Sequence, residues 1–487
     1  MQPSAAIVKI IDDIFHPRSI AVVGASKGHT SFGYQYLQIL VESGYRGRLY
    51  PVNPQEKEIL GIQVYPSLED IPGEIDYVIC CINARFVLDL LAQSSRKKVK
   101  AIHLFTGKLS ETGDEKALQL EEEIKKRAQN LGIRLIGPNC MGIYNPGERI
   151  AYNHDLCMEP GSVGAIIQSG GLAGEIVRLA ALRGVRFSKV VSYGNAADLN
   201  ETDFLEYLLW DKETKIILMY LEGVKDGQKF FKTLRRVTKE KPVIVLKGGR
   251  SRAGAKSVTS HTASIAGSIS TWQVVLRQVK AVQANSLTEL IDLCTAFYFL
   301  PPITGNRVGV VGGGGGKSVL AGDEYEEAGL EVVPIPDEII QLLAKMNPKV
   351  RRWLVNPVDA SILASLNIES ADVLRCMAQS PYFDLLCINS SEDSLFYKDD
   401  WIAFMQSYMN EAVKIHKEGS KPVIAVVGNP EIGISQVDNW RWQTLFRLRE
   451  QLIREGIPVF SSAGQAATAI VKLAYYYRYQ KAEGYNK

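Results

Sequence analysis

The sequence has no run of apolar residues long enough to cross a bilayer, and its start lacks the basic segment, apolar stretch and small-residue cleavage site of a secretory signal. Its seven cysteines show no C-x-x-C spacing, which indicates reduced, structural thiols. The sequence also has no large excess of either charge sign, because 56 Lys and Arg are nearly balanced by 53 Asp and Glu, for a net charge of +3. We therefore expect a cytoplasmic enzyme with no membrane and no nucleic-acid partner.

The length of 487 residues and a hydrophobic share of 46% indicate about three globular domains, which we place at residues 1–147, 148–300 and 301–487. Short apolar runs alternate with helix-period segments along the chain. This alternation predicts an α/β fold with doubly wound parallel sheets. In the first domain the expected strands are residues 19–23, 47–52, 77–82, 101–105 and 134–136.

A glycine-containing turn follows the first expected strand. Gly24, Ala25 and Ser26, with Gly33 further on, lead into a helix-like segment, where backbone N–H groups can hold a phosphate or pyrophosphate. The G-x-G-x-x-G spacing is absent, and Asn53 ends the second strand where an NAD site has an acid. A nucleotide-bearing ligand other than NAD is favoured.

One histidine, His261, is the candidate nucleophile of the second domain. It follows an apolar run at residues 242–246 and lies between Ser260 and Thr262, after a basic loop with Lys247, Arg250, Arg252 and Lys256. Nearby cations disfavour a charged imidazole and stabilise a phosphoryl group placed on the ring. The hypothesis is a phosphohistidine, and the alternative is a histidine that caps a helix or satisfies a hydrogen bond.

Two further segments supply partners for such a histidine. The apolar run at residues 216–220 places Glu222 near its carboxyl end, where ligands of open parallel sheets bind. A carboxylate there could hydrogen-bond one imidazole nitrogen and leave the other to attack. Ser169, Gly170 and Gly171 begin a helix-like segment whose free N–H groups can bind an anion.

The third domain contains glycines at residues 312–316, followed by Lys317 and Ser318. The P-loop spacing G-x-x-x-x-G-K-S requires glycine at position 311, where Val311 stands. We therefore expect a strand, a tight glycine turn and a helix, in a domain whose role is packing.

Segments in order along nearly the whole chain resemble the ADP-forming acyl-CoA synthetases, which are relatives of the succinyl-CoA synthetase α subunit. They are VGASKGHTSFGYQYL, LFTGKLSETG, GPNCMGIYNP, IIQSGGLAGE, MYLEGVKDGQKFF, VLKGGRSRAGAKSVTSHTASIAG and VGVVGGGGGKSVLAGDEYEEAGL. The resemblance implies a Rossmann-like CoA-binding domain followed by two flavodoxin-like domains.

The resemblance also implies functional positions in this chain, with no metal site among them. Coenzyme A is expected at Gly24, Ala25, Ser26, Gly33, Asn53, Pro54, Gly107 and Asn139, and phosphate at Ser169, Gly170 and Gly171. His261 is expected to be phosphorylated transiently, with Glu222 as its hydrogen-bonding partner. The sequence departs from the family pattern at Lys108, where an aromatic residue is usual, at Asn83 and Ala84, where a Pro-Ala step is common, and at Gln55, where a lysine is frequent.

No segment remains for the ATP-grasp domain that brings ATP in this family. The expectation is an α subunit that works with a separate ATP-grasp β subunit in an α2β2 heterotetramer, with Mg²⁺ and ATP or ADP bound by the partner. The implied reaction converts acyl-CoA, ADP and phosphate into a small carboxylic acid, CoA and ATP, reversibly, through an acyl phosphate and a phosphohistidine. Two alternatives stay open: a CoA- or acyl-CoA-sensing protein of the same fold without turnover, and an NAD(P)-linked oxidoreductase.

Overall fold

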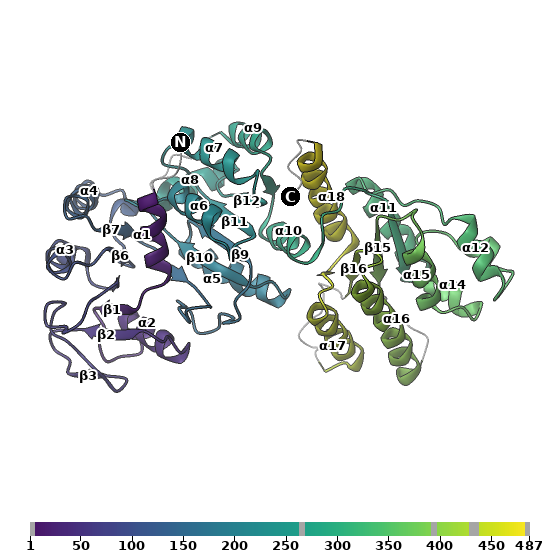
Figure 1. The fold of residues 1–487 in the computed structure, drawn as a ribbon, viewed down its shortest axis with the longest axis horizontal. Coiled ribbons are helices and arrows are strands. Elements are labelled where there is room, and N and C mark those ends of the chain that lie inside the picture. Colours follow the sequence, from purple (N-terminus) through teal and green to yellow (C-terminus); the bar gives the residue numbers. More distant parts are fainter. Residues whose placement is uncertain (1–4, 263–267, 391–396, 428–437, 483–487) are drawn as a thin grey trace. The chain divides into compact units, whose positions relative to one another are not determined.

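A computed structural model describes residues 5–262, 268–390, 397–427 and 438–482, with only the backbone described at residues 259–262. The chain forms two compact units, Met1–Leu290 and Ile291–Lys487, and Figure 1 shows their helices and strands. The first unit holds two large sheets and the second unit holds one. Within the described residues, no helix has the length and apolar character needed to span a membrane.

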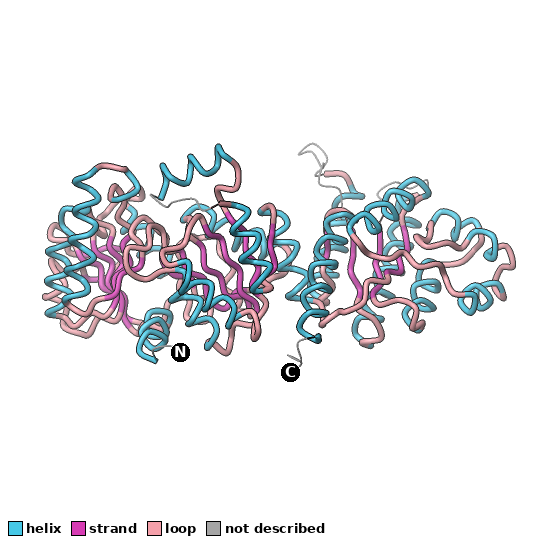
Figure 2. Tube along the Cα trace, turned by 90° about the horizontal axis from the view of Figure 1, so that it is seen from above, coloured by secondary structure: helices cyan, strands magenta, loops and turns pink. Residues whose placement is uncertain are grey.

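The first sheet is parallel, with the strand order β2-β1-β5-β6-β7. Its strands are β1 (Ser19–Val23), β2 (Arg48–Val52), β5 (Tyr77–Cys80), β6 (Ala101–Leu104) and β7 (Arg134–Ile136). These apolar runs are buried almost throughout because helices separate them in the chain and cover the sheet, among them α2 (Phe32–Glu42), α3 (Val87–Arg96) and α4 (Glu115–Asn130). Figure 2 shows these strands running between helices. The predicted α/β alternation is confirmed here, and the strand order reverses between β1 and β5.

A small antiparallel pair, β3 (Glu58–Ile59) and β4 (Ile62–Gln63), follows β2. The short 3₁₀ helices η1 (Ala84–Phe86) and η2 (Ser110–Thr112) lie in the loops after β5 and β6. These loops leave the carboxyl ends of the strands, where open α/β sheets bind their ligands.

The second sheet has the order β13-β12-β11-β9-β10-β8. Its strands are β8 (Gly142–Tyr144), β9 (Val163–Ile167), β10 (Phe187–Ser192), β11 (Ile216–Leu221), β12 (Val243–Lys247) and β13 (Val282–Ala284). Its helices in the first unit are α5 (Gly170–Leu182), α6 (Glu201–Trp210), α7 (Gly227–Val237), α8 (Arg252–Thr262) and α9 (Ile269–Val279), and α10 (Leu287–Phe299) spans the division between the units.

The second sheet is parallel except for one edge strand. β8 pairs with β10 in the antiparallel sense, with Val191 opposite Ile143. A parallel pair needs a crossover connection of a dozen or more residues, whereas a short antiparallel edge strand needs no crossover helix. The chain passes from β7 of the first sheet to β8 of the second through residues 137–141, which we had assigned to the first domain.

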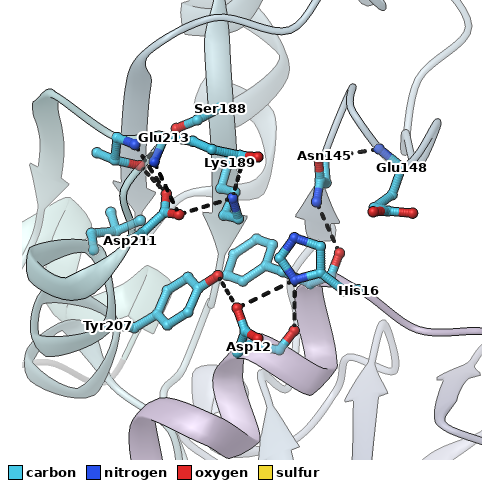
Figure 3. Close-up of polar contacts among 12 residues, drawn as sticks. Asp12, His16, Asn145, Glu148, Ser188, Lys189, Tyr207, Asp211 and Glu213 are labelled. Atoms are coloured by element: carbon cyan, nitrogen blue, oxygen red, sulfur yellow. Dashed lines mark hydrogen bonds and ion pairs between the residues drawn. The ribbon is translucent and has the colours of Figure 1, made fainter.

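The N-terminal helix α1 (Ala5–Phe15) packs on α6 of the second sheet. The rings of Phe15 and Tyr207 stack at 5.4 Å, and the Tyr207 hydroxyl donates to Asp12 Oδ1 at 3.0 Å. Asn145 donates through its side-chain amide to the carbonyl of Phe15 at 2.9 Å. Figure 3 shows Asp12, Tyr207 and Asn145 together with the buried Lys189 of β10. The contacts of Asp12 and Phe15 join the N-terminal helix to the second sheet.

The second unit contains a parallel sheet in the order β14-β15-β16-β17. Its strands are β14 (Val308–Gly312), β15 (Leu385–Asn389), β16 (Val423–Val426) and β17 (Val459–Phe460). Its helices include α11 (Gly315–Ala328), α12 (Asp337–Ala344), α13 (Val350–Trp353), α14 (Ala360–Ser365), α15 (Ser370–Gln379), α16 (Lys398–Glu418), α17 (Trp440–Arg454) and α18 (Ala463–Ala482).

The expected strand, glycine turn and helix of the third domain are confirmed as β14, the turn and α11. Gly312 and Gly313 have φ values of 102° and 85°, in the left-handed region that favours glycine. A side chain at Gly312 would collide with the backbone carbonyl of Asn389.

Candidate functional site

The candidate site lies where the strand order of the second sheet reverses, between β9 and β11. The chain leaves β9 at Gln168 and Ser169, and it leaves β11 at Glu222. Because the two strands are parallel neighbours, with Tyr220 opposite Ile167, these residues meet at one edge of the sheet. Open α/β sheets bind ligands at such a position.

Gln168 joins the two strand ends. Its side-chain oxygen accepts from the backbone N–H groups of Glu222 at 2.8 Å and Gly223 at 3.2 Å. Gln168 is not among the predicted site residues, although a polar side chain at the end of an otherwise apolar strand could have indicated it. Gln168 thus fixes the backbone that carries Glu222.

The carboxylate of Glu222 is buried, with the residue only 7% exposed. Its Oε1 atom accepts from the Tyr220 hydroxyl at 3.3 Å, and its Oε2 atom has no hydrogen-bond partner among the described residues. Burial and the neighbouring Glu222 charge raise the pKa of Tyr220, so this hydroxyl keeps its proton and donates. One carboxylate oxygen is therefore held, and the other is open to a donor.

Helix α5 begins beside this carboxylate. Ser169 is its N-cap and accepts from the N–H of Leu172 at 3.5 Å. Gly170 and Gly171 form the first turn, where N–H groups lack intrahelical partners and the helix dipole favours negative charge. The residues predicted to bind phosphate thus stand at a helix start, a kind of position that can bind an anion.

A cavity of about 240 Å³ brings several predicted site residues together. Its lining contains Gln168, Glu222 and the start of α5, together with Phe105, Asn139, Cys140, Met141 and Gly194. The cavity therefore connects Glu222, the start of α5 and Asn139, which come from three separate segments of the sequence.

The loop at residues 137–141 is held rigidly by both sheets. Asn139 donates its N–H to the carbonyl of Thr106 at 3.0 Å, and Asn195 donates its N–H to the carbonyl of Pro138 at 3.0 Å. The ring of His103 donates through Nε2 to the carbonyl of Cys140 at 2.9 Å, since a carbonyl can only accept. Asn139 has a φ of 59°, which asparagine tolerates better than most residues.

The backbone of His261 is part of α8, but its side chain is outside the part of the chain that the structure describes. Its pairing with Glu222 therefore stays a prediction. Helix α8 contacts η2 of the first sheet.

The cations predicted near His261 differ in their surroundings. Lys247 is buried, where its ammonium donates to the carbonyls of Glu222, at 2.7 Å, and Gly248, and lies 5.5 Å from the Trp272 ring centre. Burial lowers the pKa of Lys247, and the charge of Glu222 opposes this effect. Arg250 donates to the carbonyl of Asn285, whereas Arg252 and Lys256 are exposed. Lys247 thus supports the backbone of the site.

A second cavity, of about 450 Å³, lies where the first sheet reverses its strand order. Its lining includes Gly24, Asn53, Pro54, Gln55, Phe86 and Asp89. Asn53 joins the two strand ends, since its amide donates to the carbonyl of Ala25 at 2.7 Å. Among the predicted CoA residues, Gly24, Asn53 and Pro54 line this cavity, whereas Ala25, Ser26 and Gly33 do not.

Gly33 supports the turn from behind. A Cβ atom at Gly33 would lie 2.8 Å from the Cα of Ala25 and would collide with the carbonyl of Gly24. Glycine is therefore required here by close backbone packing.

Gly107 lies between Glu111 and Asn139. A Cβ atom added at Gly107 would lie 3.2 Å from Glu111 Oε1 and 3.5 Å from Asn139 Oδ1. Glu111 also accepts from the N–H of Lys108 and, at 2.7 Å, from the side-chain amide of Asn195. Asn195 therefore ties the loop after β6 to the second sheet, a role that the sequence analysis did not assign.

Comparison with known protein families gives two matches, both within residues 18–297. Residues 18–146 match the CoA binding domain, and residues 160–297 match the succinyl-CoA ligase like flavodoxin domain.

Two archaeal enzymes represent the curated relatives. The chain is 36% identical over 378 residues to the α subunit of acetate–CoA ligase [ADP-forming] II from Pyrococcus furiosus, which covers 77% of this chain and 81% of that subunit. It is also 36% identical over 347 residues to acetate–CoA ligase [ADP-forming] from Methanocaldococcus jannaschii, covering 71% of this chain and 48% of the relative. The chain thus matches most of a separate α subunit and about half of a longer relative.

Among solved structures, the acetyl-coenzyme A synthetase 1 of Candidatus Korarchaeum cryptofilum, in complex with phosphate and ADP, is similar over 97% of both chains. The TM-score is 0.82 and the sequence identity is 28%. Together with the relative that is 36% identical over most of its length, this similarity settles the family. The chain belongs to the family of ADP-forming acyl-CoA synthetases, among the relatives of their α subunits.

Proposed function

We propose that this chain is the α subunit of an ADP-forming acyl-CoA synthetase and that His261 carries the phosphoryl group. The observation that most supports this proposal is the cavity shared by Glu222, the start of α5 and Asn139. A buried carboxylate with one free oxygen can orient a neutral imidazole, and a helix start can hold phosphate. Coenzyme A would bind with its nucleotide part in the cavity beside Gly24, Asn53 and Pro54.

The reaction would proceed in three transfers. A phosphate oxygen attacks the thioester carbon, the C–S bond breaks, and CoA leaves as a thiol after taking a proton. An imidazole nitrogen of His261 then attacks phosphorus, and the P–O bond to the acyl group breaks to release the carboxylate. Finally, a terminal oxygen of ADP attacks phosphorus, and the N–P bond breaks to form ATP.

The last transfer requires a nucleotide site, which we assign to a separate ATP-grasp β subunit that binds ADP or ATP with Mg²⁺. We expect two copies of each chain in the assembly. Among the described residues of this chain, no group of three or more acidic, histidine or cysteine side chains is arranged to hold a metal ion.

Labelling of the purified full chain tests the proposal. Radiolabelled inorganic phosphate with acetyl-CoA is expected to give an acid-labile label that requires both reactants. His261→Ala should abolish the label, and Glu222→Gln should slow its appearance. His154→Ala is the matched control, because His154 is half exposed and pairs with Glu42 on the surface.

The same experiment separates the enzyme from a protein that only senses CoA. Binding of CoA to the folded chain should raise its melting temperature in either case. A CoA-dependent shift without any phosphate label would favour the sensing function, and equal labelling of His261→Ala would refute the phosphohistidine.

A further inference from the structure

The lining of the cavity beside Glu222 combines two kinds of group. The start of α5 and Glu222 provide N–H groups and a carboxylate, whereas Phe105, Cys140 and Met141 provide mainly apolar side chains. If the phosphoryl group of an acyl phosphate is at the helix start, its acyl group has these apolar side chains as its neighbours in the cavity. This step rests on the proposed function, and it identifies which residues contact the acyl group.

The backbone of Met141 is held by two hydrogen bonds. Its N–H donates to Ser192 Oγ at 3.1 Å, and its carbonyl accepts from the Tyr36 hydroxyl at 3.1 Å. Its side chain reaches the start of α5, because a Cβ atom added at Gly170 would lie 3.4 Å from Met141 Cγ and 3.9 Å from Sδ. Met141 therefore brings the loop at residues 137–141 into contact range of the helix start.

Phe105 forms the adjoining wall and is braced by two other rings. Its ring centre lies 4.6 Å from that of Phe32 and 5.5 Å from that of Tyr36. Tyr36 thus supports both walls, through its ring against Phe105 and its hydroxyl on Met141. Phe105 and Met141 therefore cannot move away from the cavity without disturbing the residues that pack against them.

The size and charge of the cavity limit the acyl group. Its volume of about 240 Å³ lies below the roughly 300–1,000 Å³ typical of pockets for drug-sized ligands, and it must also hold phosphate. The described residues that line it include no lysine or arginine, so they offer a second carboxylate no counter-charge.

We propose that Met141 and Phe105 determine the acyl specificity of this enzyme, by restricting the site to short, uncharged acyl groups. Shortening either side chain enlarges the apolar part of the cavity, which then admits bulkier acyl groups. Enlarging Met141 excludes all but the smallest.

The test is the rate at which the full chain is labelled by radioactive phosphate with each of four thioesters: acetyl-, isobutyryl-, phenylacetyl- and succinyl-CoA. For the wild type, acetyl- and isobutyryl-CoA should label quickly, phenylacetyl-CoA at least tenfold more slowly, and succinyl-CoA not at all. Met141→Ala and Phe105→Ala should each raise the rate ratio of phenylacetyl- to acetyl-CoA about tenfold or more, the range that differences in a hydrophobic pocket produce. Met141→Phe should lower the ratio of isobutyryl- to acetyl-CoA.

Met346→Ala is the matched control, because Met346 is 56% exposed and lies in the other compact unit. Unchanged ratios in the three folded variants, or a wild type that uses phenylacetyl-CoA as fast as acetyl-CoA, would overturn the proposal. Labelling of the wild type by none of the thioesters would instead contradict the proposed function. Two opposite substitutions at position 141 and one at position 105 keep the test decisive if one variant fails to fold.

Discussion

The Tyr220 hydroxyl lies 3.3 Å from Glu222 Oε1, two residues away across the end of β11. This hydrogen bond occupies one carboxylate oxygen of Glu222, while Oε2 has no partner among the described residues. Tyr220 thus positions the carboxylate of Glu222, which we propose as the hydrogen-bonding partner of His261.

Tyr220→Phe should slow phosphate labelling about tenfold, because the carboxylate loses the donor that fixes its orientation. The free energy of unfolding should fall by no more than about 1 kcal/mol, the usual net value of one hydrogen bond. Tyr475→Phe, at a residue 62% exposed, is the control, and an unchanged labelling rate in Tyr220→Phe would rule out the positioning role.

Gly248→Ala should disturb the same pair from the neighbouring strand end. The added Cβ would lie 2.5 Å from the Tyr220 hydroxyl oxygen and 3.4 Å from Glu222 Cγ, so the tyrosine must move. We expect slower labelling with unchanged CoA binding, measured by the CoA-dependent shift in melting temperature. Gly227→Ala provides the comparison, because a Cβ there meets no atom within 4 Å; equal rates in the two variants would contradict the prediction.

His103 should make stability depend on pH. It is buried beneath the loop at residues 137–141, and burial lowers its pKa from 6.5 to about 4. As the pH falls below 6.5, the unfolded chain binds this proton before the folded chain does, so stability is lost between pH 6.5 and 4. At about 1.4 kcal/mol per pH unit, the full effect is roughly 3 kcal/mol.

His103→Gln retains a side-chain N–H donor but cannot titrate. Urea unfolding at pH 7 and pH 5 should therefore show a smaller acid-induced loss of stability for the variant than for the wild type. Parallel losses in the two proteins would mean that other groups cause the effect.

Lys189 should be important for folding rather than for catalysis. It is 1% exposed in β10, and its ammonium lies 3.2 Å from Asp211 Oδ1 and also contacts Glu213, as Figure 3 shows. Lys189→Met leaves Asp211, whose side chain is only 8% exposed, without its cation, which should lower the free energy of unfolding by about 3 kcal/mol. Chemical denaturation measures this loss. The double variant Lys189→Met/Asp211→Asn should lose less stability than the sum of the losses in the two single variants. Additive losses would contradict the coupling.

The α/β alternation and most strand positions are predictable from the amino-acid pattern, because buried parallel strands are short apolar runs that loops and helices separate. It also placed Glu222 directly after β11 and Ser169 at the start of α5, as the structure confirms. No strand is predicted at β8, since the three residues of this antiparallel edge strand carry too little pattern.

The tertiary structure decided which of these segments meet. Gln168, Met141 and Phe105 are far apart in the sequence and match no catalytic motif, so no spacing rule predicts that they line one cavity. The strand order and the loop at residues 137–141 bring them together. It also decided that Lys247 supports backbone carbonyls, because the role of a cation depends on the acceptors that folding brings within reach. Local pattern is read along the chain, whereas a site is a set of contacts between strand ends that only the order of the strands in the sheet creates.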